Sequence, residues 1–355
     1  MRKVYFFASL FLFAFCLSCN STTVPQSISY ATMNYPGGAV GSSTYLTGIR
    51  GITNSSNVYI SGIYAAPGDS VTEGEGLLYT GPITGGGTWQ VLNYPSSAGV
   101  TVTSTALYGP NNGLVSGDVQ IVGNYTTSEN GAFDLGLLYQ GPTDGSGSWT
   151  SLDPQILEPI RTVHNTIAHS TMGGLVVGNY DTDLLTGKAF LYNIAEGTYL
   201  EIVKSGAVSI TAYGIWHNGG TSYTIAGGYS DVNDGGIDTA YLVDYDSSTD
   251  VFSNMTSFTY NNQAAVVTHF EGITTDTLGG YNLVADSLSG TDIIASFVNV
   301  PRSASGTFGT ASWTPYDYPG STLTSANTVY LNYALGIYEV DGSEAANGYV
   351  TTIPE

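Results

Sequence analysis

Beyond its first twenty residues, the chain consists of short apolar runs separated by polar turns, with no apolar period of helical length. Runs of this kind, rich in Val, Ile, Thr and Tyr, predict β-strands. One pattern recurs six times, with the last two copies weaker: an apolar strand ends in a small residue, any residue and Tyr, and an acidic loop and a further strand follow. The anchor positions of the six copies lie 49 to 61 residues apart, at Gly62, Gly123, Gly178, Gly227, Ala285 and Gly336. This period is typical of propeller blades and solenoid repeats.

Each repeat contains four strand-like segments, which predicts a four-stranded antiparallel blade, and six such blades form a β-propeller. The segment 33–36, Met-Asn-Tyr-Pro, matches the fourth strands that end at 92–95 and 316–319, but no first three strands precede it. The last repeat stops after its third strand, at 348–354. We therefore predict an all-β, six-bladed propeller whose last blade is closed by the N-terminal strand, which also protects two sheet edges.

Two of the copies carry the motifs of a known repeat. The fourth copy runs from 212–215 (Ala-Tyr-Gly-Ile) through 225–229 (Ile-Ala-Gly-Gly-Tyr) to 239–242, and the third pairs 176–180 with 187–192. These segments resemble extracellular HAF repeats, although Lys188 stands where that motif has histidine. The resemblance implies an exported repeat protein and no particular activity.

The N-terminus predicts export. Arg2 and Lys3 precede an apolar run that ends near Leu17, which is typical of a signal peptide. We therefore divide the chain into an export signal, 1–19, and a single propeller, 20–355. Residues 17–20 resemble the lipobox of bacterial lipoproteins, with Cys16 at the position usually held by leucine, so Cys19 is a candidate for lipidation. Ordinary signal cleavage nearby is the alternative, and a lipid anchor would be the only membrane contact.

The charge of the chain narrows its partners. Seven basic residues against 28 acidic ones give a net charge of -21, which repels phosphate backbones and excludes nucleic acid as a partner. Half of the acidic residues fall in the six predicted loops between second and third strands: Asp69, Glu73, Glu75, Glu129, Asp134, Asp181, Asp183, Asp231, Asp234, Asp238, Asp286, Asp292, Asp341 and Glu344. Since these loops share one end of a propeller, we predict an acidic face that binds a glycan, a cationic ligand or a surface protein.

Two sets of residues are candidates for binding at this face. The first, Arg161, His164, Asp181, Asp183 and His269, is expected to contact a ligand. The second is a Ca²⁺ site formed by Asp231, Asn233, Asp234 and Asp238, because calcium prefers several oxygen ligands on a tight turn. A solvated Asx-rich turn is the competing interpretation of that segment. Strand order further places His164 and His269 toward the acidic face, and His169 and His217 toward the other.

No motif for catalysis, phosphate binding or zinc occurs in the sequence. The leading hypothesis is a non-enzymatic exported propeller that binds a ligand through its acidic face. The alternative is a carbohydrate-active hydrolase or lyase that uses carboxylates of the same face, and a structural surface protein without a specific ligand is a third possibility. Carboxylates anchored on strands and facing Tyr, His or Arg across one pocket would favour the enzyme, whereas carboxylates at loop tips would favour binding.

Overall fold

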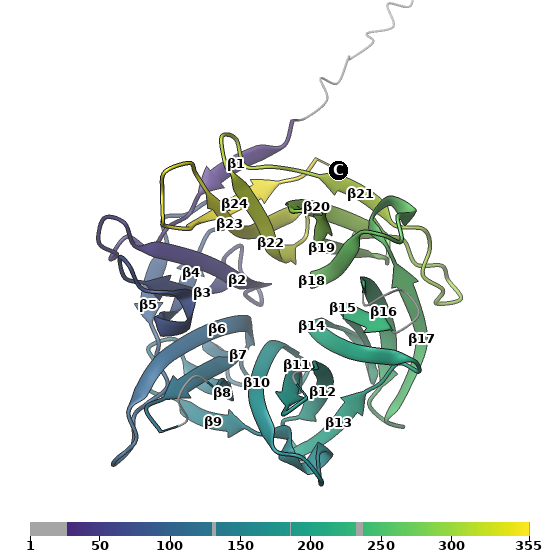
Figure 1. Ribbon diagram of the computed structural model, residues 1–355, viewed down its shortest axis with the longest axis horizontal. Coiled ribbons are helices and arrows are strands. Elements are labelled where there is room, and N and C mark those ends of the chain that lie inside the picture. The colour runs from purple at the N-terminus through teal and green to yellow at the C-terminus, as the bar shows by residue number, and fades with distance from the viewer. Residues whose placement is uncertain (1–26, 130–132, 185, 232–236, 355) are drawn as a thin grey trace, which may run out of the picture.

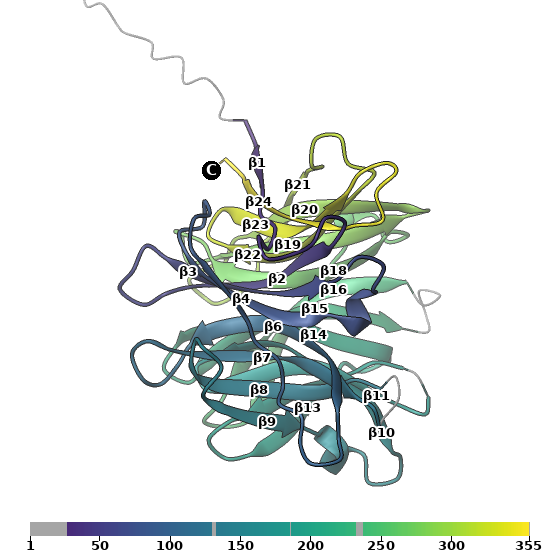
Figure 2. The ribbon, with the colours of Figure 1, turned by 90° about the vertical axis from the view of Figure 1, so that its left-hand side faces the viewer.

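The computed structural model describes residues 27–129, 133–184, 186–231 and 237–354. Six four-stranded antiparallel sheets stand around a central opening, as Figures 1 and 2 show from two directions. The predicted six-bladed propeller is thereby confirmed. Within the described part of the chain, no helix is long and apolar enough to cross a membrane.

The strands follow one another from the channel outward in every blade. Their bounds are β2 (Ser43–Gly51), β3 (Val58–Ala65), β4 (Glu75–Gly81) and β5 (Thr88–Val91) in blade 1; β6 (Val102–Asn112), β7 (Asp118–Thr127), β8 (Leu135–Pro142) and β9 (Ser148–Leu152) in blade 2; β10 (Val163–Met172), β11 (Leu175–Thr182), β12 (Lys188–Asn193) and β13 (Thr198–Ile202) in blade 3; β14 (Ala207–Gly219), β15 (Ser222–Asp231), β16 (Asp238–Asp246) and β17 (Val251–Phe258) in blade 4; β18 (Val267–Thr275), β19 (Tyr281–Ser289), β20 (Asp292–Val300) and β21 (Ser312–Pro315) in blade 5; and β22 (Leu323–Tyr330), β23 (Tyr333–Glu339), β24 (Asn347–Thr352) and β1 (Ser29–Thr32) in blade 6. Three short 3₁₀ segments, η1 (Val71–Glu73), η2 (Pro154–Leu157) and η3 (Tyr260–Asn262), lie in the connections.

Ring closure is also as predicted. β1 pairs antiparallel with β24, from Ser29 opposite Thr352 to Thr32 opposite Tyr349. The pairing continues beyond the strand, where the Met33 amide donates to the Gly348 carbonyl at 2.8 Å and Asn34 Oδ1 accepts from the Gly348 amide at 2.9 Å. The N-terminal strand thus forms the outer edge of blade 6, and the last three strands of the chain form the rest of that blade (Figure 1).

Tyrosines join neighbouring blades at the repeated motifs. The Tyr that ends one blade's fourth-strand segment stacks against the Gly-x-Tyr tyrosine of the next blade: Tyr94 lies 3.8 Å from Tyr125, and Tyr318 lies 3.7 Å from Tyr338, between ring centroids. The ring planes differ by only 2° and 3°, so each pair buries aromatic surface between two blades. These tyrosines therefore pack neighbouring blades against each other.

The cores lie between adjacent blades, where the apolar faces of successive sheets meet. One such core joins blades 3 and 4 and contains Val177, Leu191, Ile215 and Ile225, all almost fully buried. Because each sheet is covered on both faces, its middle strands are buried at nearly every position rather than at alternate ones. β3 and β7 show this pattern of burial along their whole length.

Candidate functional site

A ring of side chains lines the central channel, one from each blade. In every blade, the first strand pairs with the residue of the second strand that we use as the anchor, a glycine or alanine. Directly after the residue opposite this anchor, the regular pairing is interrupted. A β-bulge leaves one residue unpaired and re-aims its side chain. The six residues at this position, which we call the channel ring, all line one cavity of about 260 Å³: Thr47, Tyr108, His169, Tyr213, Glu271 and Asn327.

Small residues beside the ring keep the channel narrow. Gly48, Gly109, Gly214 and Gly272 directly follow ring residues, and at these positions the neighbouring first strand comes very close. A Cβ added at Gly48 would lie 2.1 Å from the Tyr108 carbonyl oxygen, and one at Gly272 would lie 3.0 Å from the Thr328 Cα. Thr47 and Asn327 also tie adjacent blades, because their side chains donate to the carbonyls of Leu107 and Leu46.

Glu271 is the one carboxylate of the channel ring. Its side chain is 21% exposed. The Nδ1 atom of His269 lies 3.9 Å from Oε1 of Glu271. Burial raises the pKa of Glu271 to about 7; the charge of His269 opposes this rise and that of Asp286 adds to it. A carboxyl group with such a pKa exchanges its proton near neutral pH, which is the property required of a general acid or a pH-dependent acceptor.

His269 links Glu271 to a second carboxylate. Its Nε2 lies 2.7 Å from Asp238 Oδ2, at the start of β16 in the preceding blade. Burial alone would lower the pKa of His269, but the hydrogen bond to Asp238 and the surrounding carboxylates raise it on balance, and the same hydrogen bond lowers the pKa of Asp238. Gly228 makes room for this ring, since a Cβ there would lie 2.6 Å from His269 Cδ2.

Asp286 lies near the same cluster but has a structural role. It accepts hydrogen bonds from the Ser325 hydroxyl at 2.5 Å and the Ala326 amide at 2.8 Å, and so joins blade 5 to blade 6. Burial raises its pKa to about 6, although these two hydrogen bonds oppose the rise. Its oxygens are thus already occupied by the protein's own donors.

Aromatic rings from blades 2, 3 and 4 line the rest of the channel wall. His169 lies between Tyr108 and Tyr213, with ring centroids 5.0 Å and 4.5 Å away, and Tyr213 in turn lies 6.1 Å from His269. Burial lowers the pKa of His169 to about 4, so that its imidazole is neutral at physiological pH. Burial, with the charges of Asp134 and Glu271, raises the pKa of Tyr108 to about 12. The wall therefore presents neutral hydroxyl and imidazole groups.

The residues expected from the sequence to bind a ligand fall into separate places. Arg161 forms an exposed ion pair with Asp183, at 2.8 and 2.9 Å, and its hydrogen bond lowers the pKa of Asp183, with a smaller contribution from the nearby His164. The His164 ring stacks on Phe133 at 4.7 Å. Asp181 accepts from the amide and side chain of Asn165. The structure thus groups Arg161, His164 and Asp183 at the rim of blade 3, and places His269 in the channel.

The expected orientation of the histidines holds for three of the four. His269 and His164 contact Asp238 and Phe133 near the second-to-third-strand loops, whereas His217 Nε2 lies 3.0 Å from the Gly220 carbonyl at the other end of the blade. His169 lies at the level of the channel ring rather than at the other face, because the bulge turns it inward.

Part of the predicted calcium segment, Asn233 and Asp234, lies outside the described residues. The two members that are described are Asp231, at the end of β15, and Asp238, which is hydrogen-bonded to His269. Among the residues that the structure describes, no three His, Cys, Asp or Glu side chains are placed to hold a metal ion. The calcium site stays a prediction.

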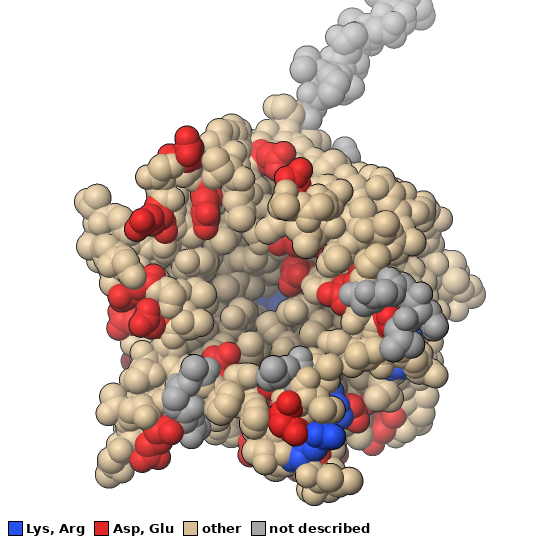
Figure 3. All heavy atoms as spheres, in the orientation of Figure 1, with Lys and Arg blue, Asp and Glu red and all other residues tan. Residues whose placement is uncertain are grey.

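Carboxylates surround the central opening on the face that Figure 3 shows, and a basic group lies deep within the opening.

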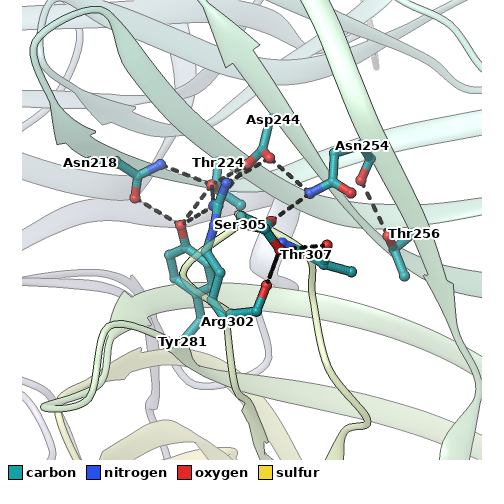
Figure 4. Close-up of polar contacts among 11 residues, drawn as sticks. Asn218, Thr224, Asp244, Asn254, Thr256, Tyr281, Arg302, Ser305 and Thr307 are labelled. Atoms are coloured by element: carbon teal, nitrogen blue, oxygen red, sulfur yellow. Dashed lines mark hydrogen bonds and ion pairs between the residues drawn. The ribbon is translucent and has the colours of Figure 1, made fainter.

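Arg302 is a second, partly buried arginine, and it does not line the channel cavity. Arg302, after β20, forms a two-pronged ion pair with Asp244 at 2.7 and 2.9 Å and donates to Tyr281 and Thr224 (Figure 4). This network joins blades 4 and 5, and its partners satisfy the guanidinium, so we interpret it as structural.

The channel ring was not predicted as a site from the sequence, although a signal for it exists. Each ring residue stands between an apolar or alanine residue and a small residue, as in 46–48 (Leu-Thr-Gly), 212–214 (Ala-Tyr-Gly) and 270–272 (Phe-Glu-Gly). Aligning the six repeats on this bulge, rather than on Gly-x-Tyr, would have placed Glu271 beside the histidines.

No protein-family model matches the chain, and no curated protein matches its sequence. Among solved structures, the Trypanosoma rangeli sialidase is similar with a TM-score of 0.56 and 10% identity, over 93% of this chain and 60% of that one. A luciferin-regenerating enzyme (TM-score 0.49, 13% identity, 88% and 93% covered) and the fucose-specific lectin of Aleuria aurantia (0.45, 12%, 85% and 89%) are also similar. At these identities, the sialidase shows a shared fold alone.

Proposed function

We propose that this protein binds the end of a glycan in its central channel, entered from the acidic face. The observation that carries the proposal is the channel ring: six bulges turn hydroxyl, imidazole, amide and carboxyl groups into one cavity. Sugars are bound by planar polar groups and by aromatic rings that stack on their apolar faces. Tyr108 and Tyr213 supply such rings, and Glu271 supplies an acceptor that has no hydrogen bond within the described protein.

The arrangement of the carboxylates favours binding over glycoside hydrolysis. Hydrolysis of a glycosidic bond requires two carboxyl groups that face each other across the bond that is cleaved. Here the imidazole of His269 stands between Asp238 and Glu271, and Asp286 accepts from Ser325 and Ala326. Among the described residues that line the cavity, Glu271 is the carboxylate left to contact a ligand.

An acid–base enzyme at the same position is the second candidate. It is favoured because Asp238, His269 and Glu271 are anchored on strands, and Glu271 faces Tyr108 of the opposite blade across the channel, the arrangement expected for a hydrolase or lyase. The environment lowers the pKa of Asp238 and raises that of Glu271, a separation typical of acid–base pairs.

A glycan array tests the binding proposal. Fluorescent protein spanning 20–355 is compared with the variant Tyr108→Ala/Tyr213→Ala, which removes the two rings proposed to stack on a sugar. Glycan binding that is lost in this variant and kept in the rim variant Arg161→Gln is expected. Binding that depends on Arg161 and not on the channel would overturn the proposal. Release of reducing ends or of unsaturated uronate products from the bound glycans would establish the enzymatic alternative.

We further propose that the protein acts outside the cytoplasm, as a secreted or lipid-anchored surface protein. The basic start, the apolar run and the lipobox-like segment ending at Cys19 support this, and they lie outside the described residues. Mass spectrometry of the N-terminal peptide from the native source tests it. A diacylglycerol on Cys19 is expected for the anchored form, and an uncleaved Met1 would contradict export.

A further inference from the structure

Arg50 forms the floor of the channel. It lies three residues beyond the ring residue Thr47 on β2, which is about 10 Å further along an extended strand. Its guanidinium carbon lies 5.2 Å from the centre of the Trp216 ring on β14. Blades 1 and 4 are opposite each other in a ring of six (Figure 1), so this contact crosses the channel.

The guanidinium has no counter-charge. Arg50 is 7% exposed, its Nε is buried without an acceptor, and no carboxylate forms an ion pair with it among the residues described. Loss of hydration lowers its pKa to about 10, while the nearby Tyr330 opposes this. A buried charge without a partner is costly, and removal of such a charge commonly stabilises a fold. Arg302, by contrast, has Asp244.

From this contrast we infer that Arg50 is an oxyanion-binding residue, and that the ligand of the channel carries one carboxylate or similar group that reaches the channel floor. The inference rests on the proposed sugar-binding function and names the class of sugar: an acidic monosaccharide unit rather than a neutral one. A planar carboxylate suits a guanidinium because two parallel N–H donors can meet its two oxygens.

The acidic face limits the ligand further. A polyanion would be repelled by the carboxylates around the opening, whereas a ligand with a single anionic end encounters less repulsion. At the ring, Glu271 is faced by His269, Asp286, Tyr108 and Tyr213. Because protonation of Glu271 removes a negative charge from the path, acidic sugars should bind more tightly at pH 6 than at pH 8.

Thermal unfolding of the protein, residues 20–355, tests the inference with D-glucuronate, its neutral counterpart D-glucose, and inorganic sulfate at matched ionic strength. A ligand that binds the folded state raises the unfolding midpoint. The variants are Arg50→Met and Arg50→Lys, with Arg161→Gln as the matched control for the loss of one arginine.

We expect glucuronate to raise the midpoint of the wild type and of Arg161→Gln, and to leave that of Arg50→Met unchanged. Without ligand, Arg50→Met should unfold at the wild-type temperature or above it. If sulfate raises the midpoint of the wild type and glucuronate does not, the ligand is a sulfated sugar that binds at the same oxyanion site. If glucose stabilises wild type and Arg50→Met equally, the oxyanion inference fails and sugar binding stands. If no probe stabilises the wild type and Arg50→Met unfolds at lower temperature, Arg50 is a structural support for Trp216 and the inference is overturned.

Discussion

At the scale of single residues, the channel is defined by charges that the protein itself leaves unbalanced. Glu271 and Arg50 line one cavity, yet neither has a hydrogen-bonded partner of opposite charge among the described residues. Other charged groups of the molecule, such as Asp244 and Asp238, do have one. Retention of unpaired charge in a narrow cavity is expected where a ligand completes the pairing.

Glu271 should make the stability of the fold depend on pH. Its folded pKa, about 7, is above the unfolded value of 4.5, so its contribution to stability is complete below pH 4.5 and is lost as the pH rises through 7. Glu271→Gln should therefore gain stability relative to wild type between pH 5 and pH 8, by on the order of 2 kcal/mol, since one pKa unit corresponds to about 1.4 kcal/mol. Urea unfolding at the two pH values measures this.

Glu344→Gln, on an exposed loop, is the control for the loss of one negative charge. Equal gains for both variants would mean that general repulsion, and not burial of Glu271, accounts for the pH dependence.

Gly228 should control the protonation of His269. Alanine at this position would place a Cβ 2.6 Å from the imidazole and displace it from Asp238, at a cost of about 1–3 kcal/mol in stability. NMR titration of the His269 ring protons should give a pKa for Gly228→Ala that is lower than in the wild type, because burial remains while the hydrogen bond is lost. An unchanged pKa would show that the hydrogen bond survives and that Gly228 does not position this residue.

At the scale of strands, the bulge in each first strand combines a structural and a functional role. In four of the six blades, glycine directly after the bulge lets neighbouring first strands approach, and in all six the bulge directs one side chain into the channel. Gly48→Ala should destabilise the fold by roughly 2–4 kcal/mol, because the new Cβ meets a backbone oxygen that cannot move aside.

Denaturant unfolding should rank Gly48→Ala as more destabilising than Gly272→Ala, whose nearest contact is 3.0 Å. Ser170→Ala, at the equivalent position of blade 3, is the control and should be tolerated. If Gly48→Ala is as mild as Ser170→Ala, the close approach of the strands is not a constraint.

The strands also show what sequence reasoning could and could not predict. The number of strands, the order of the blades and the closure of the ring could be predicted, because the apolar runs and the Gly-x-Tyr motif are local features of the sequence. The site did not, because Glu271, Tyr213 and Arg50 belong to three different repeats and meet only around the channel axis. The expected residues Arg161 and Asp183 are paired with each other at the rim. The acidic residues in the loops predicted which end of the propeller is acidic, but they did not predict the cavity in the channel.

At the scale of the whole molecule, closure of the ring holds the channel together. β1 contributes four paired residues to the last blade, and the Asn34 side chain donates to Asn347 Oδ1 at 2.7 Å. A chain that begins at residue 34 should unfold at a clearly lower temperature than one that begins at residue 27, since β24 would become an exposed edge. Equal midpoints in differential scanning calorimetry would show that β1 is dispensable.

The measurement that tests the account most directly is calorimetric titration of monosaccharides, neutral and acidic, into the wild type, the channel variant Tyr108→Ala/Tyr213→Ala and the rim variant Arg161→Gln/Asp183→Asn. The account predicts binding to the wild type and the rim variant, with at least a tenfold loss of affinity, about 1.4 kcal/mol, in the channel variant. Binding that survives in the channel variant and disappears in the rim variant, or that is absent from the wild type, would contradict a ligand site in the central channel.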